Sequence, residues 1–175
     1  MRLLYSFIAV LSGLFFATTY IKAQQPAPGS YLSNNYVTKF EGTWRWTSGN
    51  DTVTIRLKKL KTQLSNYEED ILMGTHSYIK NGRLVESSMN RFDSISSNNK
   101  KRTIFLWNDQ SADTSKTKGY IRDISRNKDG EIYLEYTLNG STPQLIWQIK
   151  VAEGAYYGSH EYGLTLPREI ILTKQ

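Results

Sequence analysis

The sequence contains no cysteine and only two histidines, His76 and His160. The absence of cysteine excludes disulfide bonds, thiol chemistry and the cysteine-linked lipid anchor of lipoproteins. A structural zinc site uses four ligands drawn mainly from cysteine and histidine, so these two histidines cannot build one. We therefore expect no metal and no cofactor, and we interpret His76 as a partly buried or rim histidine of an expected strand.

Sequence signatures of catalysis are also lacking. There is no phosphate-binding glycine loop and no nucleophile elbow. "SHEYG" (159–163) places a serine, a histidine and a glutamate side by side in the chain, whereas a catalytic triad requires side chains that converge in space. Glu131 and Glu135 share one face of an expected strand about 13 Å apart. Glycoside hydrolysis requires carboxyl groups about 5 to 9.5 Å apart, so we expect no enzyme and no catalytic residue.

Long apolar runs are confined to the start of the chain. A basic residue, Arg2, precedes the run Leu3–Ala17, and Ala23 offers a small residue at a cleavage position. This pattern is typical of a secretory signal peptide at residues 1–23 and is short for a membrane span. An uncleaved N-terminal anchor helix is the alternative. We expect a secreted or periplasmic protein with no transmembrane span after signal cleavage.

The charge of the exported chain is mild. Cleavage removes Arg2 and Lys22 but no acidic residue, so the formal net charge falls from +6 to +4. Basic clusters at 56–61 and 98–102 border expected strands, where charge discourages edge pairing. We expect no nucleic-acid partner for an exported chain of this charge. The segment 24–39, which contains "QQPAPGS", is predicted to be a flexible leader.

From Phe40 onward, short strands alternate with turn residues. Inward and outward positions alternate in "TVTIRLK" (52–58), which is typical of a half-buried strand. "NG" at Asn81-Gly82 and at Asn139-Gly140 predicts hairpin turns. The strands are expected around Trp44 and Trp46 and at 52–58, 71–80, 83–92, 103–108, 119–124, 132–138, 144–151 and 168–174.

These strands predict one all-β domain over residues 40–175. Consecutive strands joined by short turns favour an up-and-down meander, and closing such a meander removes its exposed edges. We therefore predict an antiparallel up-and-down β-barrel of about eight to nine strands. "TQLSNYEED" (62–70) is the one internal stretch predicted to form a turn or two of helix.

The motif "GTW" (Gly42-Thr43-Trp44) resembles the glycine-x-tryptophan motif of lipocalins and the wider calycin group. In those proteins the tryptophan packs across the closed end of the barrel, and a basic residue near the last strand often covers it. The resemblance implies that Gly42 and Trp44 close one end and that Arg168, in "LPREIILTK", covers Trp44 by a cation–π contact.

The chain after the signal peptide also resembles an uncharacterised family of exported Bacteroidetes proteins. The shared features are "GTW", a "D-T-x-T-I-x-L-K-K" strand at 51–59, a hairpin at 70–82 and a proline-led strand at 167–172. This resemblance supports the fold and implies no activity.

Aromatic residues are the remaining candidates for binding. The loop "EGAYYGSHEYG" (153–163) combines Tyr156, Tyr157 and Tyr162 with three glycines, a composition suited to recognition, and a loop that only covers the barrel mouth is an equal alternative. Trp46 approaches the turn at Ser48 and is the fourth candidate. Three functions stay open: a carrier of a small apolar ligand, an interaction or structural module of the cell envelope with a filled barrel, and a carbohydrate binder that stacks sugars on the tyrosine-rich loop. We expect a monomer, and interior volume should separate the first two classes.

Overall fold

The structure is a computed structural model that describes residues 26–97, 101–107, 113–151 and 163–175. It is all-β. The strands are β1 (Tyr31–Leu32), β2 (Gly42–Ser48), β3 (Asp51–Leu64), β4 (Tyr67–Lys80), β5 (Arg83–Ser87), β6 (Ile104–Trp107), β7 (Lys116–Asp123), β8 (Lys128–Asn139), β9 (Thr142–Lys150) and β10 (Glu169–Lys174), with two 3₁₀ helices, η2 (Asn35–Phe40) and η3 (Met89–Ser94).

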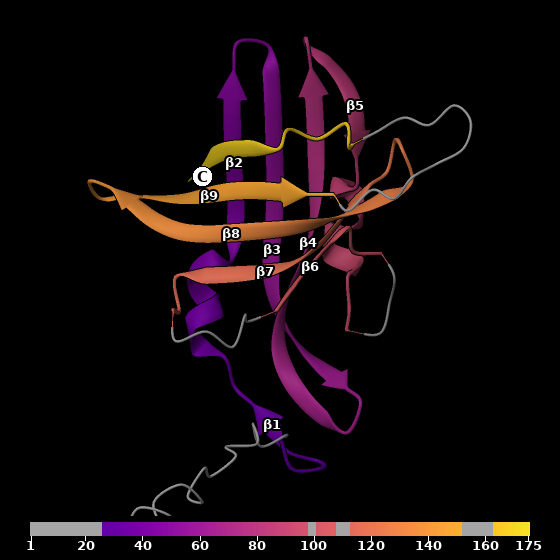
Figure 1. The fold of residues 1–175 in the computed structure, drawn as a ribbon, viewed down its shortest axis with the longest axis vertical. Helices are drawn as coiled ribbons and strands as arrows, with labels where there is room; N and C mark the ends of the chain where they lie inside the picture. The colour runs from indigo at the N-terminus through magenta and orange to yellow at the C-terminus, as the bar shows by residue number, and fades with distance from the viewer. Residues whose placement is uncertain (1–25, 98–100, 108–112, 152–162) are drawn as a thin grey trace, which may run out of the picture.

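Eight of these strands form a closed antiparallel barrel. The order is β4-β3-β2-β10-β9-β8-β7-β6, and β6 pairs with β4 to close the ring. Each barrel strand from β2 to β9 pairs with the next barrel strand along the chain, with β5 inserted between β4 and β6, and β10 pairs back to β2. The barrel is therefore an up-and-down meander, as the sequence predicted. In Figure 1 the upright strands β2, β3 and β4 lie behind β7, β8 and β9, which run across them.

The two strands outside the ring both pair with β4. β5 continues the ladder of β4 beyond β6 and pairs with Ser77–Lys80, whereas β1 adds in parallel at Glu68 and Glu69. β4 is therefore long enough to hold three partners along one edge. This explains why the strand predicted at 83–92 stops at Ser87: the chain must leave the sheet there, as η3, before β6 takes its place on β4.

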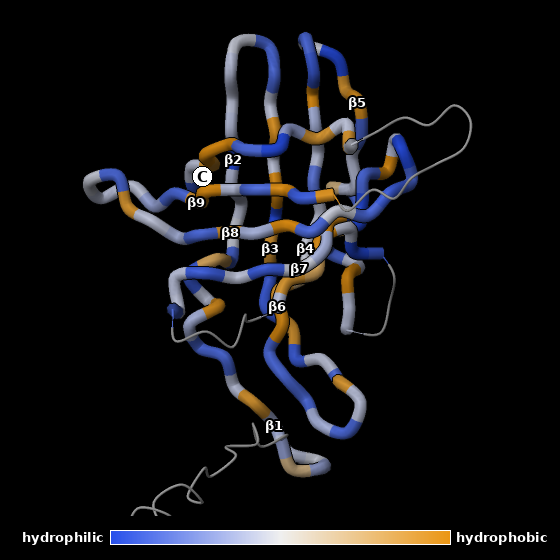
Figure 2. Tube along the Cα trace, in the orientation of Figure 1, coloured by the Kyte–Doolittle hydropathy of each residue, from blue (hydrophilic) through white to orange (hydrophobic). Residues whose placement is uncertain are grey.

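The interior is packed with apolar side chains from every barrel strand. Trp44, Trp147 and Phe40 are fully buried there, together with aliphatic residues such as Ile55 and Ile132. Figure 2 shows that hydrophobic residues gather where the strands cross the middle, while the hairpin tips are hydrophilic. Hydrophobic burial of this extent is the main stabilising contribution to such a domain.

A second, smaller core lies outside the barrel. Ile71 and Met73 point away from the interior and pack with Ile95, under a cover that includes Phe92 of η3. β4 is consequently buried on both faces from Asp70 to His76. A strand that is buried on both sides loses its simple alternation, which is why "DILMGTH" carries so many apolar residues in succession.

Two segments differ from their sequence predictions. The stretch 62–70, predicted as a helical turn, is instead the tip of the β3–β4 hairpin, where Ser65 takes a positive φ of 49°. The predicted flexible leader contains β1 and η2, and Val37 and Phe40 of η2 are buried in the core. Cross-strand pairing with β4 and burial of two apolar side chains fix both segments, and neither force is visible from local composition.

The signal peptide predicted at residues 1–23 lies outside the described residues. Among the residues that the structure describes, no helix has the length and apolarity needed to cross a membrane.

Candidate functional site

The end of the barrel that carries η2 is closed by aromatic packing. The Trp44 indole Nε1 donates a hydrogen bond to the carbonyl of Phe40 at 2.8 Å. The Tyr136 ring makes T-shaped contacts with the rings of Phe40 and Trp44, at centroid distances of 6.1 and 6.2 Å. Gly42 has a φ of 117°, which a residue with a side chain rarely adopts, so the chain turns from η2 into β2 at a position suited to glycine.

The cation over Trp44 is Lys174 rather than Arg168. Lys174 pairs directly with Trp44 in the β10–β2 ladder, and its Nζ lies 5.2 Å from the centre of the indole ring. Arg168 precedes β10, six residues away at the other end of that strand, and is exposed. The expected cation–π contact exists, but strand register assigns it to the last residue of β10, which spacing along the chain could not reveal.

The opposite end of the barrel interior holds a cluster of buried polar side chains, which we call the interior polar network. Its members come from β4, β5, the turn after β5, the residue before β6 and the end of β7, and they are His76, Glu86, Ser88, Thr103 and Asp123. All five residues are buried. The prediction of a partly buried or rim histidine was therefore wrong for His76, whose side chain is fully enclosed.

Both nitrogens of the His76 ring have a partner. Nε2 lies 2.5 Å from the Glu86 carboxylate and Nδ1 lies 2.9 Å from the Thr103 hydroxyl. The Ser88 hydroxyl lies 2.8 Å from Thr103 and accepts a hydrogen bond from the His76 backbone N–H at 3.0 Å. Buried polar groups are tolerated when they are hydrogen-bonded in this way, so the network joins β4, β5 and the start of β6.

The second half of the network is centred on Asp123. Burial favours the neutral form of this carboxyl, but hydrogen bonds from the backbone N–H groups of Arg126 and Thr165 and from the Ser125 hydroxyl outweigh burial and lower the pKa of Asp123. The Ser125 N–H also donates to the second oxygen of Glu86 at 2.7 Å. The turn after β7 and the segment before β10 are thereby tied to β5.

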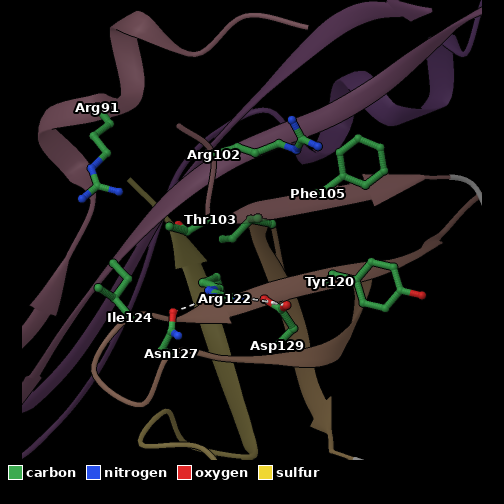
Figure 3. Close-up of a pocket in the computed structure, with 10 residues that line it drawn as sticks. Arg91, Arg102, Thr103, Phe105, Tyr120, Arg122, Ile124, Asn127 and Asp129 are labelled. Atoms are coloured by element: carbon green, nitrogen blue, oxygen red, sulfur yellow. Dashed lines mark hydrogen bonds and ion pairs between the residues drawn. The ribbon is translucent and has the colours of Figure 1, made fainter. Parts of the chain in front are cut away.

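The outer side of the barrel carries a groove of about 900 Å³ along β6 and β7. We call it the arginine groove and define it by Arg91, Arg102, Phe105, Tyr120 and Arg122. Figure 3 shows Arg91 on the side of η3, Phe105 and Tyr120 on the other side, and Arg122 between them. Phe105, Tyr120 and Arg122 point outward because they alternate with the buried Ile104, Leu106 and Ile121 along β6 and β7.

Aromatic rings extend the floor of this groove. The ring of Trp107 lies 5.9 Å from that of Phe105 and 5.2 Å from that of Tyr120, all by centroid distance. A smaller hollow of about 190 Å³ continues past Trp107 to Tyr133 on β8. Tyr120 is half exposed, so the outer face offers accessible ring surface.

The predicted ligand-binding residues are only partly described. Tyr156, Tyr157 and Tyr162 lie outside the described residues, as does His160. Trp46 is on β2, half-buried and packed against the main core. Sequence reasoning missed both the interior polar network and the arginine groove. A polar residue in an inward position of an alternating strand, such as Asp123 after Ile121, was the available signal for the first.

Metal-ligating groups do not gather in the described ranges: no three side chains from His, Asp and Glu are placed to hold one ion. Glu131 is exposed on the outer face of β8, where the sequence placed it.

The fold defines the class of protein as a closed eight-stranded antiparallel β-barrel with two additional strands. The chain belongs to DUF6705, a family of unknown function whose profile matches residues 1–175. No curated protein and no solved structure matches the chain.

Proposed function

We propose that the protein is an exported interaction module of the cell envelope, a binding protein and not an enzyme, whose barrel is filled by its own side chains and whose partner binds on the outside. The observation that carries this proposal is the packing of the interior. Trp44, Trp147 and Phe40 are the three largest fully buried side chains, and all three belong to the main core. An eight-stranded barrel is just wide enough to be filled by its side chains or to hold one small ligand.

The polar end of the interior supports the same proposal. A carrier of an apolar molecule needs a mostly apolar pocket, whereas this end contains two carboxylates and a histidine that bond to one another and to backbone groups. An apolar ligand placed there would separate these groups from their partners, at a cost of about 1–3 kcal/mol for each one left unsatisfied.

The proposal is tested by titrating the protein, without residues 1–23, with the apolar fluorescent probe N-phenyl-1-naphthylamine and with benzene. The expected result is no saturable binding of either compound. Ile132→Ala provides the matched control, because a cavity lined by apolar residues can bind benzene. Saturable one-to-one binding of the naphthylamine to the unmodified barrel would contradict the proposal and favour the carrier.

A further inference from the structure

The arginine groove collects positive charge on the outer face of the barrel. Among the residues that the structure describes, the lining contains Arg91, Arg102 and Arg122 and one acidic residue, Asp129. Arg122 is held by Asp129 at 2.8 Å and by the side-chain oxygen of Asn127, as Figure 3 shows. These two contacts orient the guanidinium of Arg122 and leave the groove with more positive than negative charge.

The other two arginines flank this anchored one. The Arg102 guanidinium stacks over the Phe105 ring at 4.7 Å, and burial lowers the pKa of Arg102. Its positive charge is therefore partly removed from water. An anion interacts more strongly with a charge in such a partly buried site than with one in bulk water. Arg91 projects from η3 and is exposed. Guanidinium groups bind carboxylates through paired, charge-assisted hydrogen bonds.

Ring surface lies beside these cations. Tyr120 and Trp107 form a tilted pair on the strand face, and the hollow beyond them reaches Lys118 and Tyr133. The faces of aromatic rings carry partial negative charge, which attracts the polarised C–H groups on the flat faces of sugar rings. Cations next to an extended aromatic surface therefore match a ligand made of sugar rings that bear carboxylates.

An acidic peptide fits this face less well. Extended peptides commonly bind by adding a strand to an open sheet edge. In the barrel β6 is paired with both β4 and β7, and β7 is paired with β8, so the groove is floored by strands whose edges are already occupied.

We propose that the arginine groove binds an acidic oligosaccharide, with uronate carboxylates on Arg91 and Arg102 and a sugar ring against Tyr120. This inference deepens the proposed function, because it names the partner class of the outer surface of the module.

The test measures binding by isothermal titration calorimetry with three probes of matched length: oligogalacturonate, a neutral cello-oligosaccharide and oligoglutamate. We expect oligogalacturonate to bind at least tenfold more tightly than either of the other probes. Its affinity should fall as the salt concentration is raised, because the pairing is electrostatic. Absence of oligogalacturonate binding would overturn the proposal.

Variants then place the site. Arg91→Gln and Tyr120→Ala change exposed side chains and should each weaken oligogalacturonate binding about tenfold. Arg83→Gln on β5 and Ile171→Ala on β10 are matched controls at exposed positions outside the groove, and both should bind as the parent does. Thermal unfolding of all four variants verifies that they are folded.

Two results would contradict the assignment. Equal losses in the groove variants and the controls would place binding elsewhere. Binding of oligoglutamate as tight as that of oligogalacturonate, unaffected by Tyr120→Ala, would identify an acidic-peptide site. The apolar-probe titration reports on the interior separately, so a failure of the filled-barrel proposal and a failure of the groove proposal are distinguishable.

Discussion

His76 Nε2 and Glu86 Oε1 lie 2.5 Å apart inside the barrel, and both side chains are almost completely closed to solvent. The contact joins β4 to β5 beyond the point where β6 leaves the ladder of β4. Because a pair of this kind is buried with its other hydrogen bonds satisfied, each partner depends on the other to remain inside.

Removal of one partner should therefore be costly. We expect Glu86→Ala to lower the free energy of unfolding by about 1–3 kcal/mol, because the buried His76 ring nitrogen loses its hydrogen-bond partner. Glu86→Gln retains the shape and one acceptor, so it should cost less. Urea denaturation of the three proteins measures the difference. If Glu86→Ala unfolds at the same urea concentration as the parent, the contact does not stabilise the barrel.

Trp44 is predicted to be the main stabilising residue of the closed end. Trp44→Ala removes a fully buried indole and should cost about 3–5 kcal/mol. Trp107→Ala is the matched control, because the Trp107 ring lies on the outer face, and it should cost clearly less. The denaturant midpoints of the two variants are compared. Equal midpoints would show that burial of Trp44 contributes no more to stability than the outer-face position of Trp107 does.

The finding that Lys174, and not Arg168, covers Trp44 can be tested directly. Lys174→Met keeps most of the aliphatic chain and removes the charge over Trp44, so it should cost about 0.5–1 kcal/mol. Arg168→Met removes an exposed charge that lies away from Trp44, and its unfolding temperature should match that of the parent. A larger effect at Arg168 would restore the original assignment.

Acid should destabilise the protein partly through Asp123. Its pKa is lower in the folded protein than its usual 3.8, so the ionised carboxylate stabilises the fold above pH 4. That contribution is lost as the pH falls below 3.8 towards the folded-state pKa. Asp123→Asn should therefore be less stable than the parent at pH 6, and the gap should narrow by pH 2. Thermal unfolding between pH 2 and 6 measures it, with Asp93→Asn as the control, because the Asp93 side chain is 92% exposed.

The pairing between β6 and β7 should not tolerate a side chain at Gly119. A Cβ there would lie 1.9 Å from the carbonyl oxygen of Phe105 on β6, and at Gly74 it would lie 2.3 Å from the carbonyl oxygen of Arg56. We expect Gly119→Ala to cost at least 1–3 kcal/mol, since rigid backbone must move. Pro167→Ala, outside β6 and β7, is the control in the same thermal unfolding assay. A stable Gly119→Ala would show that β6 and β7 can separate without penalty.

The sequence by itself determined the strand class and the order of the meander. Three patterns indicate them: the alternation in β3, the asparagine–glycine turns and the aromatic residues of the strands. Each pattern involves residues that are close in the sequence, so a short stretch is enough to recognise it. Gly42 and Trp44 are singled out through the resemblance of "GTW" to the glycine-x-tryptophan motif of lipocalins, and in the structure Gly42 has a positive φ and Trp44 is buried.

Only the tertiary structure decided which distant residues meet. The choice of Lys174 over Arg168 depends on the register between β10 and β2, which are joined by no turn. The path of residues 83–95 depends on the pairing of one part of the β4 edge with β6, which leaves only the rest of that edge for β5. The interior polar network combines residues from 76 to 123, and the arginine groove combines η3 with the outer face of β6 and β7. Long-range pairing and burial set these relationships, because the same polar residue can lie on a solvated face or inside a barrel depending on what packs against its strand.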